Sequence, residues 1–266
     1  MSEKNRGNEP ILLRQDMDEG IVVLTLNRPD KRNALSSALI ADVQEALDEI
    51  TADTSVKVVV LSGAGPAFSA GHDLNEVRTL PGYDETHELF QACSRMMMSV
   101  VQLPQPVIAR VHGVATADGC QLVASCDLAI ASETARFGTP GVNIGRFCTT
   151  PSVALSRKIA PKHAMEMLLT GELIDAQTAY RFGLVNRVVP PEELDGTVMA
   201  FARAIATRSS ETISIGKSAF YRQAELDMQH AYSYASEVMA KNMMGHDAPE
   251  GIDAFLQKRK PEWHGR

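Results

Sequence analysis

The chain has 266 residues, 44% hydrophobic and 22% charged, which allows a large buried core and is ordinary for a globular protein. Its net charge of −7 excludes a general nucleic-acid-binding protein, because neutralising phosphates requires clustered Lys and Arg. No apolar run approaches the roughly 20 residues of a membrane span. The N-terminus has neither a hydrophobic signal core nor an acid-poor transit composition, so we expect a cytoplasmic protein that binds neither nucleic acid nor membrane.

The cysteines predict free thiols rather than a disulfide framework or a metal site. They form no CxxC pair and show no metal-ligand spacing with histidine, and their neighbours are apolar. Buried free thiols are typical of a reducing compartment. The four positions are Cys93, Cys120, Cys126 and Cys148.

Strand-like and helix-like segments alternate through much of the chain. Continuous apolar runs rich in β-branched residues predict strands, and apolar residues three and four positions apart predict helices. Strand, helix and strand in this order favour parallel pairing through crossover helices, and therefore an α/β fold. The predicted strands cover residues 21–26, 56–61, 106–111 and 127–131, and the predicted helices cover 36–50, 86–103 and 119–125.

The C-terminal part is predicted to be helical. Pro161 starts a helix that Gly171 ends, and Asp175 caps a second helix that Gly183 ends. An extended segment follows over 184–189, and the pattern from 192 to 257 is almost entirely helical. The chain is therefore divided into a flexible N-terminus over 1–12, an α/β core over 13–200 and a helical region over 201–266.

Two turns of small residues each follow a predicted strand and lead into a helix. Small residues let the backbone approach a ligand, and the first N–H groups of a helix have no partner within it. Two such donors aimed at one point would form an oxyanion hole, although a turn of this kind is often only a tight connection. Neither turn matches a dinucleotide or P-loop motif. They read Ser69-Ala70-Gly71-His72-Asp73-Leu74 and Ala117-Asp118-Gly119-Cys120-Gln121.

Further motifs run through the chain from roughly residue 20 to 262. They are NRPDKRNAL at 27–35, FSAGHDL at 68–74, GCQLVASCDLA at 119–129, FGTPGVNIG at 137–145, LTGE at 169–172, residues 179–189, and AFLQKRKP at 254–261. In this order they resemble the enoyl-CoA hydratase/isomerase (crotonase) family. The resemblance implies a spiral of ββα units and a C-terminal helical region that assembles homotrimers or dimers of trimers.

The resemblance also implies a ligand and the residues that hold it. The ligand is an acyl-CoA thioester, with coenzyme A as part of the substrate and no separate cofactor or metal. The backbone N–H groups of His72 and Asp118 would form the oxyanion hole beside Gly119. Coenzyme A would lie along Arg32, Ala34, Ala70, Gly71, Asp73 and Leu74, and Lys258 would meet phosphate.

The chain departs from the family pattern where hydratases carry two glutamates. Hydration of a double bond needs a positioned acid and base. The first glutamate position holds Gln121, whose amide has no useful proton affinity, and the second holds Gly141, which has no side chain. This argues against ordinary hydratase turnover.

Other side chains near the turns have two interpretations each. Asp118 is either a relocated base or, as we favour from sequence, a helix N-cap. The His72 imidazole either faces the thioester or packs aside while only its N–H acts. Arg146 either binds a substrate carboxylate or forms a surface ion pair. Cys148 is expected to line the pocket, and Asp127 to cap the start of a strand.

Three functions remain open from the sequence. The leading prediction is an acyl-CoA-binding lyase or isomerase that stabilises a thioester enolate. The second is a malonyl-type CoA decarboxylase, since residues 69–73 are similar to the corresponding turn of methylmalonyl-CoA decarboxylase and loss of CO₂ needs no base in its first step. The third is a non-catalytic acyl-CoA-binding subunit.

Overall fold

The main β-sheet has six strands within residues 9–265, which the computed structural model describes. Its order is β1-β2-β3-β5-β7-β10; β1 pairs antiparallel with β2, and every other neighbouring pair is parallel. β3 is buried along its whole length, which explains its unbroken apolar run. The strands are β1 (Leu12–Met17), β2 (Ile21–Leu26), β3 (Val58–Gly63), β5 (Val107–Val111), β7 (Leu128–Ser132) and β10 (Arg187–Val189).

A smaller sheet alternates with the main one along the chain. β3, β5 and β7 lie in the main sheet, and the strand that follows each of them lies in the smaller sheet. This repetition of two strands and a helix is the ββα spiral, so the predicted α/β fold class is confirmed. The order is β4-β6-β8-β9, formed by β4 (Ala67–Ser69), β6 (Val114–Thr116), β8 (Arg136–Gly138) and β9 (Ile174–Asp175).

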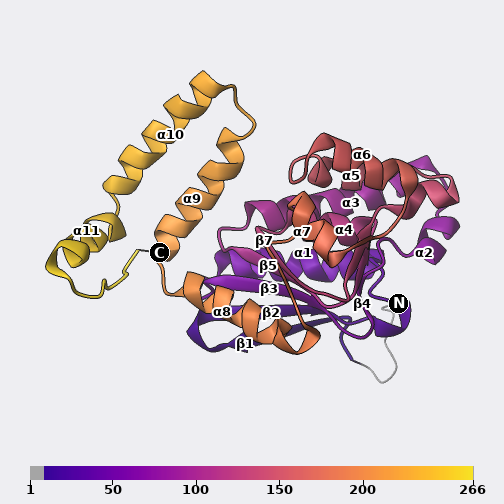
Figure 1. The fold of residues 1–266 in the computed structure, drawn as a ribbon, viewed down its shortest axis with the longest axis horizontal. Coiled ribbons are helices and arrows are strands. Elements are labelled where there is room, and N and C mark those ends of the chain that lie inside the picture. Colours follow the sequence, from indigo (N-terminus) through magenta and orange to yellow (C-terminus); the bar gives the residue numbers. More distant parts are fainter. Residues whose placement is uncertain (1–8, 266) are drawn as a thin grey trace.

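Helices cover both faces of the main sheet, as Figure 1 shows. Successive side chains of a strand point to opposite faces, so Val58 and Val60 pack with α8 (Leu194–Ala206), whereas Val59 and Leu61 face the larger core. Helices α1, α3 and α4 contribute to that larger core. The first seven helices are α1 (Ser37–Ala52), α2 (Leu74–Thr79), α3 (Tyr83–Gln102), α4 (Asp118–Ser125), α5 (Thr149–Leu155), α6 (Pro161–Thr170) and α7 (Ala176–Phe182).

The N-terminal strand β1 was not predicted. Only one of its residues, Leu12, is even partly buried, so the segment lacks an apolar pattern, and it is an edge strand held by pairing with β2. Ile11 beside it is buried. Of the N-terminus predicted to be flexible, residues 1–8 lie outside the described part of the chain.

The helices α9 (Ser210–Gln223), α10 (Met228–Met243) and α11 (Asp247–Gln257) form an arm that projects from the sheet layers (Figure 1). The predicted boundary at residue 200 stays a prediction; α8 crosses it and packs on the sheet. Partly buried polar contacts join α9 to the core. Lys217 Nζ lies 2.7 Å from Asp127 Oδ2, and the Tyr221 hydroxyl donates to Asp127 Oδ1 at 3.0 Å.

Candidate functional site

Three loops meet at one edge of the smaller sheet. β4, β6 and β8 are neighbouring parallel strands, so their carboxyl ends lie at the same edge. The loop after β4 carries residues 70–73, and the loop after β6 opens α4. A 3₁₀ turn over Pro140–Ile144 follows β8. The topology thus gathers both glycine turns and Gly141, which are far apart in the sequence.

Backbone and polar contacts hold the first turn. Gly71 has a φ of +85°, which a residue with a Cβ rarely adopts, and its carbonyl accepts from the Leu35 N–H at 2.8 Å. Asp73 caps α2 through the Asn75 N–H and forms a buried ion pair with Arg28 at 3.0 Å. Burial opposes the charge of Asp73, but the hydrogen bond and charge of Arg28 hold its pKa below the ordinary value.

The second turn lies directly against the first. A methyl group added to Gly71 would lie 3.1 Å from the Asp118 nitrogen, and one added to Gly119 would lie 2.2 Å from the Ser69 carbonyl oxygen. Ala117, the N-cap of α4, has a φ of 49°, an uncommon value for alanine. Within residues 9–265 neither the His72 nor the Asp118 backbone N–H donates a hydrogen bond. Glycine therefore sets how close the two turns come.

The side chains of the same two residues face each other. His72 Nε2 lies 3.5 Å from Asp118 Oδ1, and the side chains are only 1% and 7% exposed. Both ring nitrogens of His72 lack a hydrogen-bond partner in the part of the chain that the structure describes. The favoured sequence interpretation of Asp118 as an N-cap is wrong: Ala117 occupies the N-cap position, and the Asp118 carboxylate is turned to His72 and the Thr150 hydroxyl.

Phe90 and Cys93 from α3 and Arg146 from the loop after β8 complete the surroundings of this pair. The His72 ring packs edge to face with the Phe90 ring, with 4.9 Å between the ring centres. The guanidinium of Arg146 lies over the same Phe90 ring, 5.5 Å from its centre. Cys93 brings its sulfur within 4.8 Å of ligand atoms of both His72 and Asp118. Burial, and then the Asp118 charge, raises the pKa of the Cys93 thiol, so it remains neutral near pH 7. Sequence spacing gave no sign of this cluster.

Gln121 and Gly141 stand at the two positions where the resemblance predicts glutamates. Gln121 is buried one turn after Asp118 on α4, and its Oε1 has no partner among the described residues. A Cβ at Gly141 would come within 2.7 Å of both the Arg146 carbonyl oxygen and the Cys148 sulfur. The loop after β8 is therefore packed for glycine, and a glutamate there would displace its backbone.

The residues predicted to hold coenzyme A divide into two groups. Ala34 and Gly71 are buried, whereas Arg32 and Leu74 are exposed, with Leu74 at 50%. Ala70 donates its N–H to the Arg32 carbonyl, which joins these two segments. Lys258 instead ends α11, and Figure 1 places that helix at the far end of the arm from α2. One chain does not bring Lys258 to the turns.

Thiol reactivity provides a direct test of this burial. Cys93, Cys120 and Cys126 are buried, and burial raises the pKa of Cys120 and of Cys126 to about 12. Cys148 is only partly buried. With a disulfide reagent at pH 8, we expect one thiol per native chain to react and four in denaturant. Cys148→Ser should remove the native reaction; rapid labelling of a second thiol would contradict this arrangement.

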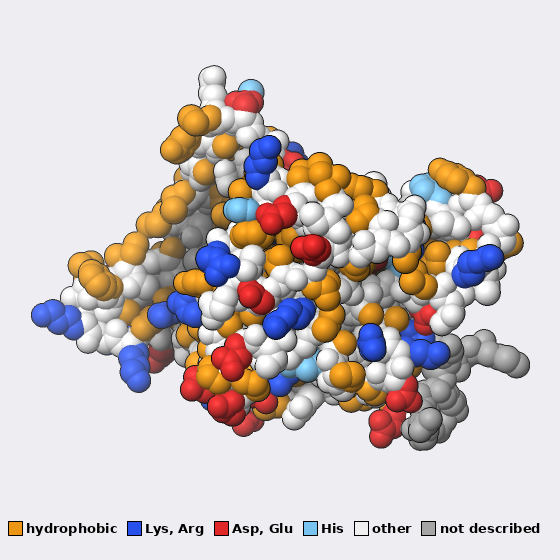
Figure 2. Space-filling view, turned by 45° about the vertical axis from the view of Figure 1, so that its right-hand side comes forward, with side chains coloured by type: hydrophobic (Ala, Val, Ile, Leu, Met, Phe, Trp, Pro, Cys, Tyr) orange, Lys and Arg blue, Asp and Glu red, His pale blue; other side chains and the backbone are white. Residues whose placement is uncertain are grey.

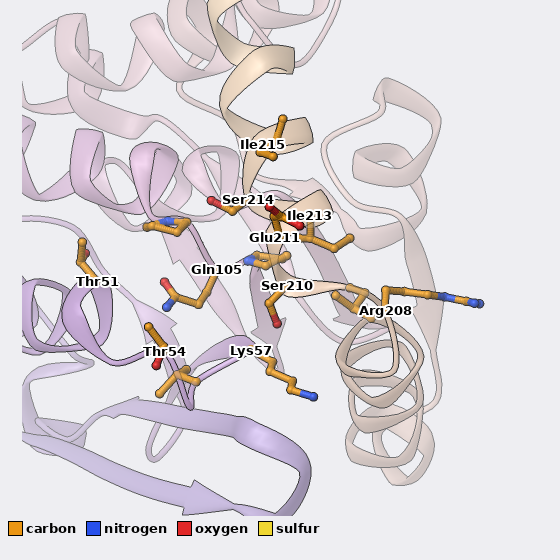
Figure 3. Close-up of a pocket in the computed structure, with 14 residues that line it drawn as sticks. Thr51, Thr54, Lys57, Gln105, Arg208, Ser210, Glu211, Ile213, Ser214 and Ile215 are labelled. Carbon is orange, nitrogen blue, oxygen red and sulfur yellow. The ribbon is translucent and has the colours of Figure 1, made fainter. Parts of the chain in front are cut away.

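A cavity of about 400 Å³ lies away from the turns, where α8 ends and α9 begins. Figure 3 shows it between the end of α1, the residues around Lys57 and Gln105, and the first turns of α9. None of the residues predicted to bind the thioester lines it. It lies where the arm joins the sheet layers.

The fold and the paired turns define a crotonase-type protein. The chain belongs to the enoyl-CoA hydratase/isomerase family, whose model matches residues 16–266. It is 46% identical over 256 residues to the mouse enoyl-CoA hydratase domain-containing protein 3, covering 96% of this chain and 85% of that protein. A crystal structure of a Mycobacterium smegmatis enoyl-CoA hydratase is 51% identical, with a TM-score of 0.94 over 96% of this chain and all of that chain. The structure of human enoyl-CoA hydratase domain-containing protein 3 is 47% identical, with a TM-score of 0.92 over the same shares.

The predicted location is corrected by the same comparison. The mouse, rat, human, frog and zebrafish relatives all carry the word mitochondrial in their names, so the prediction of a cytoplasmic protein is wrong. The sequence argument used the free cysteines and the composition of the first residues, and neither distinguishes the cytoplasm from another reducing compartment. Among the described residues, no helix has the length and apolar character needed to cross a membrane.

Proposed function

We propose that the chain binds an acyl-CoA thioester where the two turns meet and stabilises its enolate. The thioester oxygen would accept hydrogen bonds from the backbone N–H groups of His72 and Asp118. The observation that carries this proposal is the contact of the turns, which places Gly71 against the Asp118 nitrogen while both N–H groups have no acceptor within residues 9–265. Asp118 also begins α4, whose dipole favours negative charge.

The proposed reaction is of the lyase or isomerase type and proceeds without the two usual glutamates. Gln121 cannot act as a base, and Gly141 is closed in by Arg146 and Cys148. Backbone donors are unaffected by these replacements, so enolate stabilisation remains while hydration by the glutamate route is lost. A chain that only binds acyl-CoA would give the same affinity with no turnover of crotonyl-CoA or methylmalonyl-CoA.

A second candidate, decarboxylation of a malonyl-type thioester, is favoured by Arg146. Its guanidinium lies over Phe90, the ring that packs on His72, and it forms no ion pair within the described residues. An arginine in this position suits a substrate carboxylate. Loss of CO₂ from such a substrate yields the same oxyanion-stabilised enolate.

We further propose assembly into homotrimers or dimers of trimers through the arm. Figure 2 shows hydrophobic side chains along it. Large apolar side chains this exposed favour burial against another copy, and Lys258 would then approach coenzyme A from a neighbouring subunit. The most exposed on the arm are Met228, Tyr232, Met239, Met244, Phe255 and Leu256.

A pair of ligands that differ only at the carbonyl tests the proposed oxyanion site. Butyryl-CoA and S-butyl-CoA share the nucleotide and the alkyl chain, but only the thioester can accept two N–H hydrogen bonds. Since a hydrogen bond contributes about 0.5–1.5 kcal/mol net, we expect butyryl-CoA to bind about tenfold more tightly by calorimetry. Free coenzyme A serves as the control for the shared part. Equal dissociation constants for the two would rule out the oxyanion site.

A further inference from the structure

We propose that His72 is the proton-exchanging group of this site and that Asp118 orients it. The proposal rests on the proposed function, because the substrate proton is the one on the α-carbon of the bound thioester. It assigns to a histidine–aspartate pair the role that the missing glutamates leave vacant. The structural basis is the 3.5 Å approach of His72 Nε2 to Asp118 Oδ1 in a buried setting.

The arrangement fixes which ring nitrogen can act. A neutral imidazole has one N–H and one lone pair, and an adjacent carboxylate favours the N–H on the nitrogen that faces it. Neither ring nitrogen has a hydrogen-bond partner among residues 9–265, but Nε2 faces Asp118 Oδ1 at 3.5 Å, so we assign the N–H to Nε2 and the lone pair to Nδ1. Nδ1 is carried by the same residue whose backbone N–H is proposed to hold the thioester oxygen. Base and oxyanion donor are therefore covalently tied together.

The Asp118 carboxylate has no competing structural role. It is not the N-cap of α4; its Oδ1 lies 3.5 Å from His72 Nε2 and accepts a hydrogen bond from the Thr150 hydroxyl at 3.5 Å. The groups near it from other elements are the neutral Cys93 thiol on α3 and the Cys148 thiol, whose pKa burial also raises. Arg146 lies over the ring of Phe90, which also packs on the imidazole. The Asp118 carboxylate is therefore placed to orient the His72 ring through Nε2.

The proton transfer balances without any further reactant. The α-carbon–hydrogen bond breaks, and its proton passes to His72 Nδ1, giving an imidazolium beside the Asp118 carboxylate. The bonding electron pair moves into the carbon–carbon bond of the enolate, and the negative charge rests on the thioester oxygen. Return of the proton regenerates the thioester, so the minimal observable reaction is exchange of the α-proton with solvent.

The test is α-proton exchange of butyryl-CoA in D₂O, followed by proton NMR. Butyryl-CoA is saturated, so hydration cannot contribute. We expect wild-type exchange well above the buffer rate, and a loss of about 100-fold or more in Asp118→Asn and in His72→Gln, the range of general-base catalysis. Butyryl-CoA affinity should change less than about threefold in Asp118→Asn, because the backbone donors are kept.

A matched control comes from the other histidine–aspartate pair, on α10. His230 Nδ1 lies 2.5 Å from Asp227 Oδ2 in solvent, and Asp227 caps that helix, a role asparagine performs equally well. Asp227→Asn makes the same chemical change away from the turns and should leave exchange unchanged. Chelation with EDTA should also leave it unchanged, although His72, Cys93 and Asp118 are donor types that zinc accepts.

A spectroscopic measurement on the wild type is independent of how the variants fold. Long-range ¹H–¹⁵N spectra should show neutral His72 protonated at Nε2. Protonation at Nδ1, undiminished exchange in Asp118→Asn, or exchange lost on chelation and restored by zinc would each overturn the proposal. Tight butyryl-CoA binding with no wild-type exchange would overturn it while leaving the oxyanion site intact. Equal affinity for butyryl-CoA and S-butyl-CoA would instead remove the proposed function itself.

Discussion

Gly119→Ala is expected to abolish acyl-CoA binding and to lower the free energy of unfolding by about 1–3 kcal/mol, the range for overpacking a close contact. The added Cβ would lie 2.2 Å from the Ser69 carbonyl oxygen and 2.8 Å from the Ser69 carbonyl carbon. These are backbone atoms, so relief requires the two turns to separate. Separation moves the Asp118 N–H away from the His72 N–H. Urea unfolding and calorimetry with butyryl-CoA measure the two effects.

Gly216→Ala provides the matched control. Gly216 lies inside α9, and a Cβ there would meet nothing within 4 Å. Alanine is the better helix former, so this variant should gain about 0.5–1 kcal/mol and bind butyryl-CoA as the wild type does. If Gly119→Ala kept full affinity, the contact between the turns would not be what positions the thioester.

Lys217→Met should be the most destabilising change outside the turns, at about 3 kcal/mol, because it leaves a largely buried carboxylate without its cation. Lys217 contacts Asp127 and also donates to the Val100 and Gln105 carbonyl oxygens. Burial lowers the pKa of Lys217, and the charge of Asp127 opposes that shift. Since this cluster joins α9 to the core, hydrogen exchange should accelerate through α9 before the main sheet opens.

Lys241→Met tests whether ion pairs in general matter to this protein. Lys241 pairs with Glu237 on the exposed surface of α10, where water and salt screen the interaction. Urea unfolding should show no measurable change in stability. Equal effects of the two lysine substitutions would contradict the anchoring role of Lys217.

Periodicity and helix signals predicted the larger elements well, because each reflects local physics. The predicted helix over 36–50 corresponds to α1, with Ser36 as its N-cap, and the predicted strand over 56–61 corresponds to β3. Gly171 and Gly183 end their helices in the left-handed conformation, as predicted. Asp127 does cap a strand start, accepting from the Val107 N–H at 2.7 Å.

Features that depend on distant contacts were not predicted. The strands of the smaller sheet have only two or three residues, too few for a period-two pattern, and β1 is stabilised by its neighbour rather than by burial. The contact of His72 with Asp118 depends on the order of β4 and β6 in that sheet, which the sequence does not state. From the sequence alone, Asp118 is therefore predicted to have the commoner local role of an acidic residue at a helix start, which is to act as the N-cap.

The distance between the two turns is set by hydrogen atoms where other residues have side chains, at Gly71 and Gly119. The side chains at the neighbouring positions 72 and 118 therefore do not determine this distance. Their side chains can be exchanged while the backbone stays in place, so a combinatorial library at these two positions would vary the reactive groups on a constant scaffold. For the engineering of thioester chemistry, positions 72 and 118 can therefore be varied, whereas Gly71 and Gly119 must be kept.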